Sequence, residues 1–353
     1  MDYTLLLIVV LLVVIGLVIL YSTSAYNGQV KFHDSFYYLK KQAFATVLGI
    51  VLMLFVAGMD YHIWQRLAVF GYLAAVALSV AVMLFGREIN GSKRWLALGP
   101  FSFQPSEFAK VALILFLADL VTKNVKTIGK MWTLCRIMFW ILPIVGLVGA
   151  SNLSTAIIIL GIGVILIFVA SPKYAQFALM GIAGACFMGI FLALESYRLE
   201  RLAIWRNPEK YEKGYQTLQG LYAIGSGGVF GVGIGNSVQK LGFVPEAQND
   251  MIFSIICEEL GIFGGLIVLM LYAYLLYRLF VIAQNAPDMF GSLMVSGIFI
   301  HIALQVILNI AVVVNLMPNT GVTLPFISYG GTSVLFLMAE MGIALGVSRK
   351  IKI

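Results

Sequence analysis

Asp250 stands between a polar turn and a long apolar run, a position that favours a chemical role. Pro245 predicts the turn, and the run that follows predicts a helix. A helix N-terminus favours an ionised carboxylate, because its dipole and free N–H groups are positive. Helix capping alone would also explain this position. A cap does not need the nearby glycines, Lys240 or Glu246, so we predict that Asp250 is a working carboxylate.

A second group of ionisable residues opens another apolar run. Glu107 and Lys110, in the sequence QPSEFAK, are three residues apart and share one face of a helix. They form either a self-neutralising ion pair or a cavity-lining pair that also contacts substrate. Further along the helix after Asp250, Glu258 and Glu259 lie on different faces. We therefore expect at least one of them to pair with another helix.

The segment before Asp250 is rich in glycine, at positions 227, 228, 231, 233 and 235. Glycines at this density allow backbone to approach a phosphate or allow helices to pack closely, and the sequence leaves both open. No GK[ST] follows, so the segment is not a P-loop. Four basic residues that we expect on one side of a membrane, the outer side, could bind anionic phosphates. They are Lys93, Arg94, Arg206 and Lys240.

The elements that position these residues are membrane spans. The chain has 353 residues, of which 61% are hydrophobic and 11% charged. Runs of about 20 apolar residues cross a bilayer as helices, because lipid offers the backbone no hydrogen bonds. We predict an all-α polytopic membrane protein with about ten spans, at 4–24, 42–59, 64–86, 105–122, 137–150, 152–170, 173–194, 250–278, 290–315 and 325–348. The fifth and sixth could be one broken span.

We treat residues 1–353 as a single membrane domain, with one large extracytoplasmic loop at 195–249 between the seventh and eighth spans. The distribution of Lys and Arg between the short loops places both termini in the cytoplasm. The net charge of +7 fits such flanking residues and does not indicate nucleic acid. The first run continues to about residue 20 and reads as a span, not a cleavable signal.

A last polar segment, residues 317–333, contains two prolines and three glycines among apolar residues. So many helix breakers predict a shaped or re-entrant segment, which is tolerated only against protein or a wet cavity. His301, a lone histidine in the ninth span, is expected to be a satisfied polar group between helices. The three cysteines show no metal-binding or disulfide spacing.

Three long motifs occur in the order found in one family. They are NGSKRWLALGPFSFQPSEFAK at 90–110, AIGSGGVFGVGIGNSVQKLGFVPEAQNDMIFSIICEELG at 223–261 and PNTGVTLPFISYGGTS at 318–333. Together they resemble the SEDS family (shape, elongation, division and sporulation), which comprises the RodA, FtsW and SpoVE polymerases of peptidoglycan. The wording SFQPSEFAK is nearer to the FtsW/SpoVE branch. Residues 152–155, NLST, lack the acidic residue that the family often has there, so we give that position no catalytic role.

The resemblance implies a peptidoglycan glycosyltransferase that polymerises lipid II on the outer side of the bacterial cytoplasmic membrane. It implies a class B penicillin-binding transpeptidase as partner, alongside membrane lipid. The family's essential acid falls on Asp250, which we expect to be the general base. Substrate-binding positions are expected at Arg94, Trp95, Glu107, Lys110, Lys240 and Ser328. We expect a divalent cation, Mg²⁺ or Mn²⁺, with unknown ligands.

Two other functions suit the same sequence. A lipid II flippase would also need about ten spans and buried charges, but it should place its key charges near the midplane of the bilayer. A non-catalytic scaffold for the transpeptidase would not depend on Asp250 at all.

Overall fold

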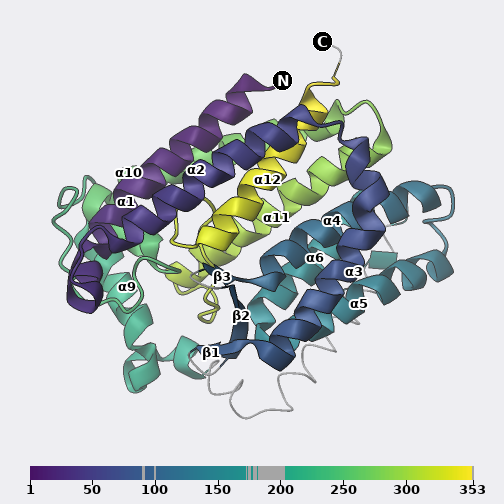
Figure 1. Cartoon of the computed structure of the whole chain (residues 1–353). Helices are drawn as coiled ribbons and strands as arrows, with labels where there is room; N and C mark the ends of the chain where they lie inside the picture. The colour runs from purple at the N-terminus through teal and green to yellow at the C-terminus, as the bar shows by residue number, and fades with distance from the viewer. Residues whose placement is uncertain are drawn as a thin grey trace.

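The computed structural model describes residues 1–89, 92–98, 101–171, 173, 176–177, 181 and 203–351. Long helices form one bundle, with both termini at one end and the short strands and α9 at the other (Figure 1). The long helices are α1 (Tyr3–Phe32), α2 (Tyr37–Gly58), α3 (His62–Phe85), α4 (Pro105–Asn124), α5 (Met131–Ser151), α6 (Leu153–Ala170), α10 (Ile252–Gln284), α11 (Met289–Val313) and α12 (Gly331–Ser348).

Eight of these helices in the described part are long and apolar enough to cross a membrane. The protein is therefore an α-helical, multi-pass membrane protein, as predicted. α4 is of similar length, but it carries Glu107, Lys110, Asp119 and Lys123 and lies inside the bundle. The expected span at 173–194 lies almost wholly outside the described residues, so the count of ten stays a prediction.

The predicted boundaries need correction at both ends of the chain. α1 continues to Phe32, well beyond the expected end at 24. The last helix begins at Gly331 rather than 325, because other partners bind the backbone before it. The amide of Tyr329 donates to the Gln248 carbonyl at 2.9 Å, and the amide of Gly330 donates to the Gln42 side chain at 3.1 Å.

The fifth and sixth spans are two separate helices. Asn152 lies between α5 and α6 in an extended conformation, and its side chain caps α6 by accepting from the Thr155 amide at 3.3 Å. The NLST sequence thus turns the chain between two packed helices.

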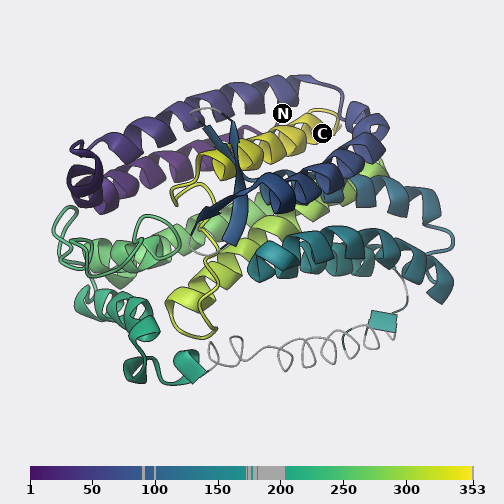
Figure 2. The same ribbon diagram turned by 60° about the horizontal axis from the view of Figure 1, so that its bottom comes forward.

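A small antiparallel sheet was not predicted. It consists of β1 (Arg87–Ile89), β2 (Ser92–Leu98) and β3 (Phe101–Phe103), in the order β1-β2-β3. Figure 2 shows these strands lying across the ends of the helices. Thr332 at the start of α12 donates to the Ser102 carbonyl at 2.8 Å, which ties the sheet to the bundle.

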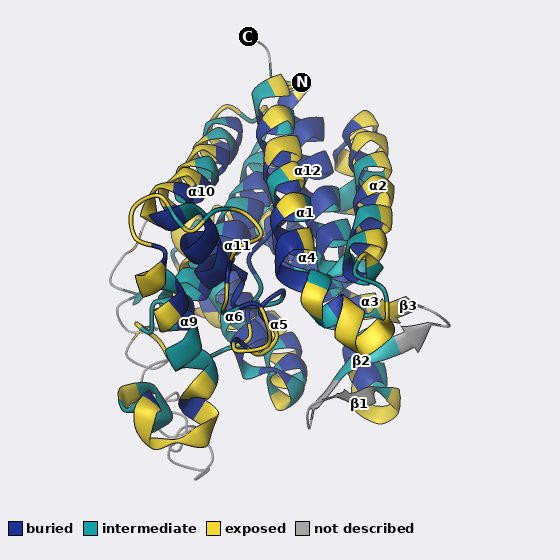
Figure 3. Cartoon of the chain, turned by 90° about the vertical axis from the view of Figure 1, so that its left-hand side faces the viewer, coloured by how far each residue is buried: buried dark blue, intermediate teal, exposed yellow. Residues whose placement is uncertain are grey.

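The centre of the bundle is densely packed around α4 and α12, whose residues are mostly buried (Figure 3). Small residues bring α12 against α2. A Cβ on Gly342 would lie 2.6 Å from the Met53 carbonyl oxygen, and one on Gly49 would lie 2.9 Å from the Met338 side chain. Such close backbone approach is typical of helix contacts in membranes.

α10 is broken at Gly261, which has φ +70° and ψ −173°. The glycine-rich segment supplies the hydrogen bonds that the break removes. Val232 and Gly233 donate their amides to the carbonyls of Glu258 and Glu259, and the amides of Ile262 and Phe263 donate to Gly228 and Val229. Gly227 and Gly231 serve close packing against α10, one of the two uses that the sequence allowed, because a Cβ on either would lie 1.9 or 2.2 Å from a carbonyl oxygen of that helix.

The described part of the large loop starts at residue 203. It contains two short turns, Pro208–Lys210 and Glu212–Gly214, and then the helix α9 (Tyr215–Ser226). Trp205 donates from its ring nitrogen to the Asn315 carbonyl at 3.0 Å, which joins the loop to the segment after α11. The loop thus packs onto the same end of the bundle as residues 314–330.

Candidate active site

Asp250 lies two residues before α10, in the turn that the sequence predicted. Its side chain is nearly buried, with 9% of the residue exposed. Burial raises the pKa of this carboxyl to about 6, and the nearby negative charge of Glu246 adds to the rise. Hydrogen bonds from the Asp250 and Met251 amides and from Gln216 oppose it. The rise in pKa caused by burial therefore exceeds the fall caused by the hydrogen-bond donors at the start of the helix. The carboxyl group nevertheless stays mostly ionised at neutral pH.

Two polar side chains that the sequence did not single out hold Asp250 in place. Gln216 of α9 donates to the carboxylate at 3.4 Å and to the Pro245 carbonyl at 3.2 Å. Asn319 in turn donates to the Gln216 side chain at 3.0 Å. Gly321 lies so close that a Cβ there would be 3.9 Å from the carboxylate. Asn319 and Gly321 belong to the PNTG motif, whereas nothing in the local sequence marks Gln216.

Glu107 and Lys110 form the predicted ion pair, with 2.9 Å between Nζ and Oε1. The structure connects this pair to Asp250 through α11. Lys110 donates to Gln305 at 3.1 Å. One turn further along α11, Asn309 donates to the main-chain carbonyls of Asp250, at 2.8 Å, and of Val322, at 2.7 Å.

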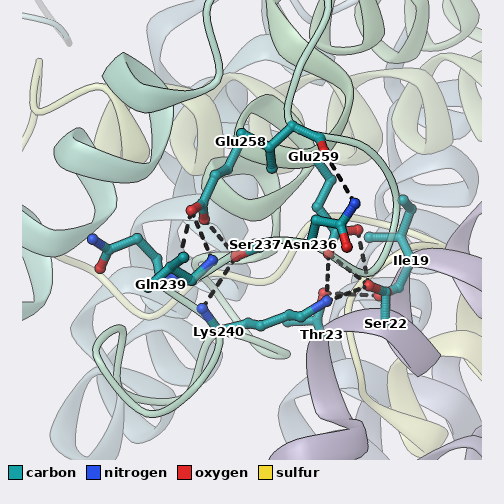
Figure 4. Close-up of polar contacts among 11 residues, drawn as sticks. Ile19, Ser22, Thr23, Asn236, Ser237, Gln239, Lys240, Glu258 and Glu259 are labelled. Atoms are coloured by element: carbon teal, nitrogen blue, oxygen red, sulfur yellow. Dashed lines mark hydrogen bonds and ion pairs between the residues drawn. The ribbon is translucent and has the colours of Figure 1, made fainter.

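Glu258 and Glu259 anchor the loop (Figure 4), and Glu259 meets Ser22 of α1, so the prediction that at least one of them pairs with another helix is confirmed. Glu258 accepts from the Ser237 hydroxyl and from the Val238 amide. Glu259 accepts from Lys240 at 2.6 Å and from Ser22 of α1.

Lys240 is only 6% exposed, and its ammonium also donates to the Ser22 hydroxyl at 2.9 Å. Its charge is thus balanced by Glu259 inside the protein. This placement favours an anchoring role for Lys240 over phosphate binding.

The remaining predicted residues lie at the same end of the bundle. Arg94 and Trp95 are half-buried on β2, and Arg94 donates to the Ser151 carbonyl at 3.0 Å. Ser328 is buried, and its hydroxyl accepts from the Leu324 amide at 2.9 Å, so it closes a turn. Arg206 is exposed, while the side chain of Lys93 lies outside the described residues.

No cluster of three or more His, Cys, Asp or Glu side chains suited to a metal occurs among the residues that the structure describes. Asp250 and Glu246 are the carboxylates of this site. Mg²⁺ in proteins is commonly held by one or two carboxylates together with substrate phosphates and water. The residues present therefore fit a cation that arrives with a phosphorylated substrate, and not a fully protein-built site.

Comparison with known proteins gives the same family as the sequence motifs, with a match over nearly the whole chain. Residues 3–353 match the model of the FtsW/RodA/SpoVE family, described as cell cycle proteins. The stage V sporulation protein E of Bacillus subtilis (strain 168) is 40% identical, over 99% of this chain and 97% of its own length. A probable peptidoglycan glycosyltransferase FtsW of Trichlorobacter lovleyi is 35% identical, over 100% of this chain and 94% of its own.

Solved structures agree with the sequence match. A chain from a peptidoglycan synthase complex, studied for its coordination of polymerization and crosslinking, superimposes with a TM-score of 0.86 at 30% identity, covering 99% of this chain and 98% of that one. The rod shape determining protein RodA of Thermus thermophilus gives a TM-score of 0.74 at 29% identity, covering 100% and 98%. The chain belongs to the SEDS family of FtsW, RodA and SpoVE, with its affinity on the FtsW/SpoVE side.

Proposed function

We propose that this protein is a peptidoglycan glycosyltransferase that polymerises lipid II, with Asp250 as the general base. The observation that carries the proposal is a nearly buried carboxylate with a pKa of about 6, held between α9, α10 and the 314–330 segment. Relatives named as probable peptidoglycan glycosyltransferases cover this chain from end to end. Their names do not favour the flippase or the scaffold.

The chemistry needs a base because a sugar hydroxyl is a poor nucleophile. In the proposed step, an Asp250 oxygen takes the proton of the acceptor sugar's hydroxyl group, while the oxygen of that hydroxyl group forms a bond to the anomeric carbon of the donor. The bond from that carbon to the pyrophosphate oxygen breaks, and undecaprenyl pyrophosphate leaves with the electron pair. General bases of this kind contribute about 10²–10⁴-fold to a rate, and a pKa near 6 leaves the base ionised at pH 7.

The leaving pyrophosphate requires positive charge nearby. We propose that Arg94 contributes it, and that a divalent cation, Mg²⁺ or Mn²⁺, supplies further charge neutralisation when it is bound with the substrate.

Chelation should therefore stop polymerisation by the purified protein, and adding back either cation should restore it. Full activity after exhaustive chelation would contradict the cation requirement without affecting the assignment of Asp250.

We further propose that a class B penicillin-binding transpeptidase works beside this protein, since the similar structure comes from a synthase complex that couples polymerization to crosslinking. Asp250, α9 and the sheet share the end of the bundle opposite the termini (Figure 1). Cytoplasmic termini would place the reaction on the outer side of the membrane.

Asp250→Asn tests the proposal. It keeps the shape of the side chain but cannot accept a proton, so purified protein given lipid II and a cation should form no glycan strands. Asp34→Asn, at a half-buried aspartate paired with Lys40, is the matched control and should polymerise normally. Undiminished polymer from Asp250→Asn would refute the base, and translocation of labelled lipid II without polymer would favour a flippase.

A further inference from the structure

Four ionisable side chains meet in the middle of the bundle, away from the polar loops. Glu107 and Lys110 come from α4, His301 from α11 and Glu340 from α12, with 7%, 2%, 2% and 0% of each residue exposed. An uncompensated charge in such an apolar interior is very unfavourable, so the group as a whole must be close to neutral. Its hydrogen bonds show where the protons are.

Gln305 lies at the centre of this group, and its partners fix the orientation of its amide. The Thr323 carbonyl, 3.1 Å from Nε2, can only accept a hydrogen bond, whereas the Lys110 ammonium, 3.1 Å from Oε1, can only donate one. The same Oε1 lies 2.9 Å from Nε2 of His301. Nε2 of His301 must therefore carry a hydrogen.

The other ring nitrogen faces a carboxylate. Nδ1 of His301 lies 2.9 and 3.0 Å from the two oxygens of Glu340. This contact needs one proton, carried either by the ring or by the carboxyl group. In both cases the His301–Glu340 pair is neutral overall, and so is the Glu107–Lys110 pair beside it. The Ser333 side chain, which bonds Glu107, adds no charge.

We propose that His301 and Glu340 share one proton and act as positioning residues for Asp250. The proton keeps Nε2 of His301 directed at Gln305, which holds Lys110 on one side and the Thr323 carbonyl on the other. The neighbouring Val322 carbonyl and the Asp250 carbonyl are both bound by Asn309, one turn along α11. The pair thus sets the path of residues 321–323 against the active carboxylate without touching substrate.

The test compares His301→Gln, Glu340→Gln and the double variant. In His301→Gln, Glu340 loses the ring with which it shares a proton, so it must take a proton from solvent to stay neutral. The melting temperature of the His301→Gln variant in detergent should be below that of the wild type, and this difference should grow between pH 6 and 8. Glu340→Gln allows a neutral ring that donates from Nε2 and accepts at Nδ1, so it should melt above His301→Gln. The double variant buries no charge at positions 301 and 340, so it should regain most of the melting temperature that His301→Gln loses.

Activity gives the positioning readout, and this arm alone depends on the proposed function. His301→Gln should lower kcat for lipid II polymerisation by at least tenfold with KM within about twofold, and the double variant should regain most of kcat. If the wild type makes no polymer, the proposed function fails, while the melting order still tests the shared proton. A double variant no better than His301→Gln at any pH would overturn the proposal.

Nitrogen NMR gives a readout that needs neither activity nor unfolding. The chain has three histidines. Replacing His33 and His62 by Asn leaves His301 as the only labelled ring. We expect a proton on Nε2 in the wild-type background and in Glu340→Gln, and a bare Nδ1 in Glu340→Gln. An unprotonated Nε2 in the wild-type background would contradict the hydrogen-bond assignment.

Discussion

At the scale of the residue, the proposed role of Asp250 as a base is opposed by the burial of its carboxyl group. Burial favours the protonated carboxyl, whereas a general base must be ionised. Gln216 and the backbone amides offset part of the burial, and the resulting pKa of about 6 lies just below neutral pH. Activity and stability should therefore respond to pH in opposite directions.

The sign of each response follows from a folded-state pKa above 3.8, the ordinary value for an aspartate carboxyl group. The native state keeps its proton up to about pH 6, so the stability from this group is fully present below pH 4 and is lost as the pH rises through 6. The polymerisation rate should rise over the same interval, as the base becomes ionised.

Asp250→Asn removes the cost of ionisation together with the base. At pH 7 the Asp250→Asn variant should be more stable than the wild type, by up to roughly 3 kcal/mol for a shift of about two pKa units. Melting curves in detergent at pH 4 and pH 7 check this, because the gain should vanish at pH 4. A variant that is less stable at pH 7 would show that the carboxylate is not held at a cost.

At the scale of the element, the break in α10 positions Asp250. Glu258 and Glu259 lie just before Gly261 and hold the loop both through their backbone carbonyls and through their side chains. The short helical piece between Asp250 and Gly261 is therefore clamped by the glycine-rich loop.

Gly261→Ala should weaken this clamp. Its φ of +70° is unfavourable for alanine, and the new Cβ would lie 2.3 Å from the Val229 carbonyl oxygen. We expect a loss of roughly 2–4 kcal/mol in stability with a large loss of activity. Gly225→Ala is the control, because a Cβ there meets nothing within 4 Å. Equal effects of the two variants on melting temperature would exclude a special role for the break.

At the scale of the whole molecule, the bundle separates two ends. The amide of Asp2 donates to the Ser348 hydroxyl at 3.0 Å, so the two terminal helices meet at one end. The sheet and α9 lie at the other (Figures 1 and 2), and Asp250 lies there too, within hydrogen-bond reach of Gln216 of α9. Lipid-linked substrates can be polymerised outside the cell only if the second end faces outward.

Cysteine labelling checks this orientation. In a chain whose three cysteines are replaced, Lys210→Cys lies in the large loop and Lys126→Cys lies between α4 and α5, and both positions are exposed. A membrane-impermeant maleimide should label Lys210→Cys on intact spheroplasts and Lys126→Cys only after permeabilisation. The reverse pattern would place the termini outside.

Hydropathy and helix breakers were sufficient to predict most of the fold from sequence. Residues 317–324 were expected to lie between the last two spans without helix and do so, whereas 325–330 were placed in the last span and are not helical. The sheet was missed, although Asn90-Gly91 and Gly99-Pro100 are turn signals between short extended runs. The long apolar runs on either side were assigned as helical spans, and the short segment between them was assigned no strands.

By itself, the sequence determined the membrane class, the Glu107–Lys110 pair and the place of Asp250 before a helix, because apolar runs and residue spacing are local properties. Only the tertiary structure decided that Gln216 binds Asp250, that Lys240 is neutralised by Glu259 and that His301 faces Glu340. Those contacts join residues between 19 and 39 positions apart. No local pattern encodes which buried charge meets which partner, since that depends on how the helices pack.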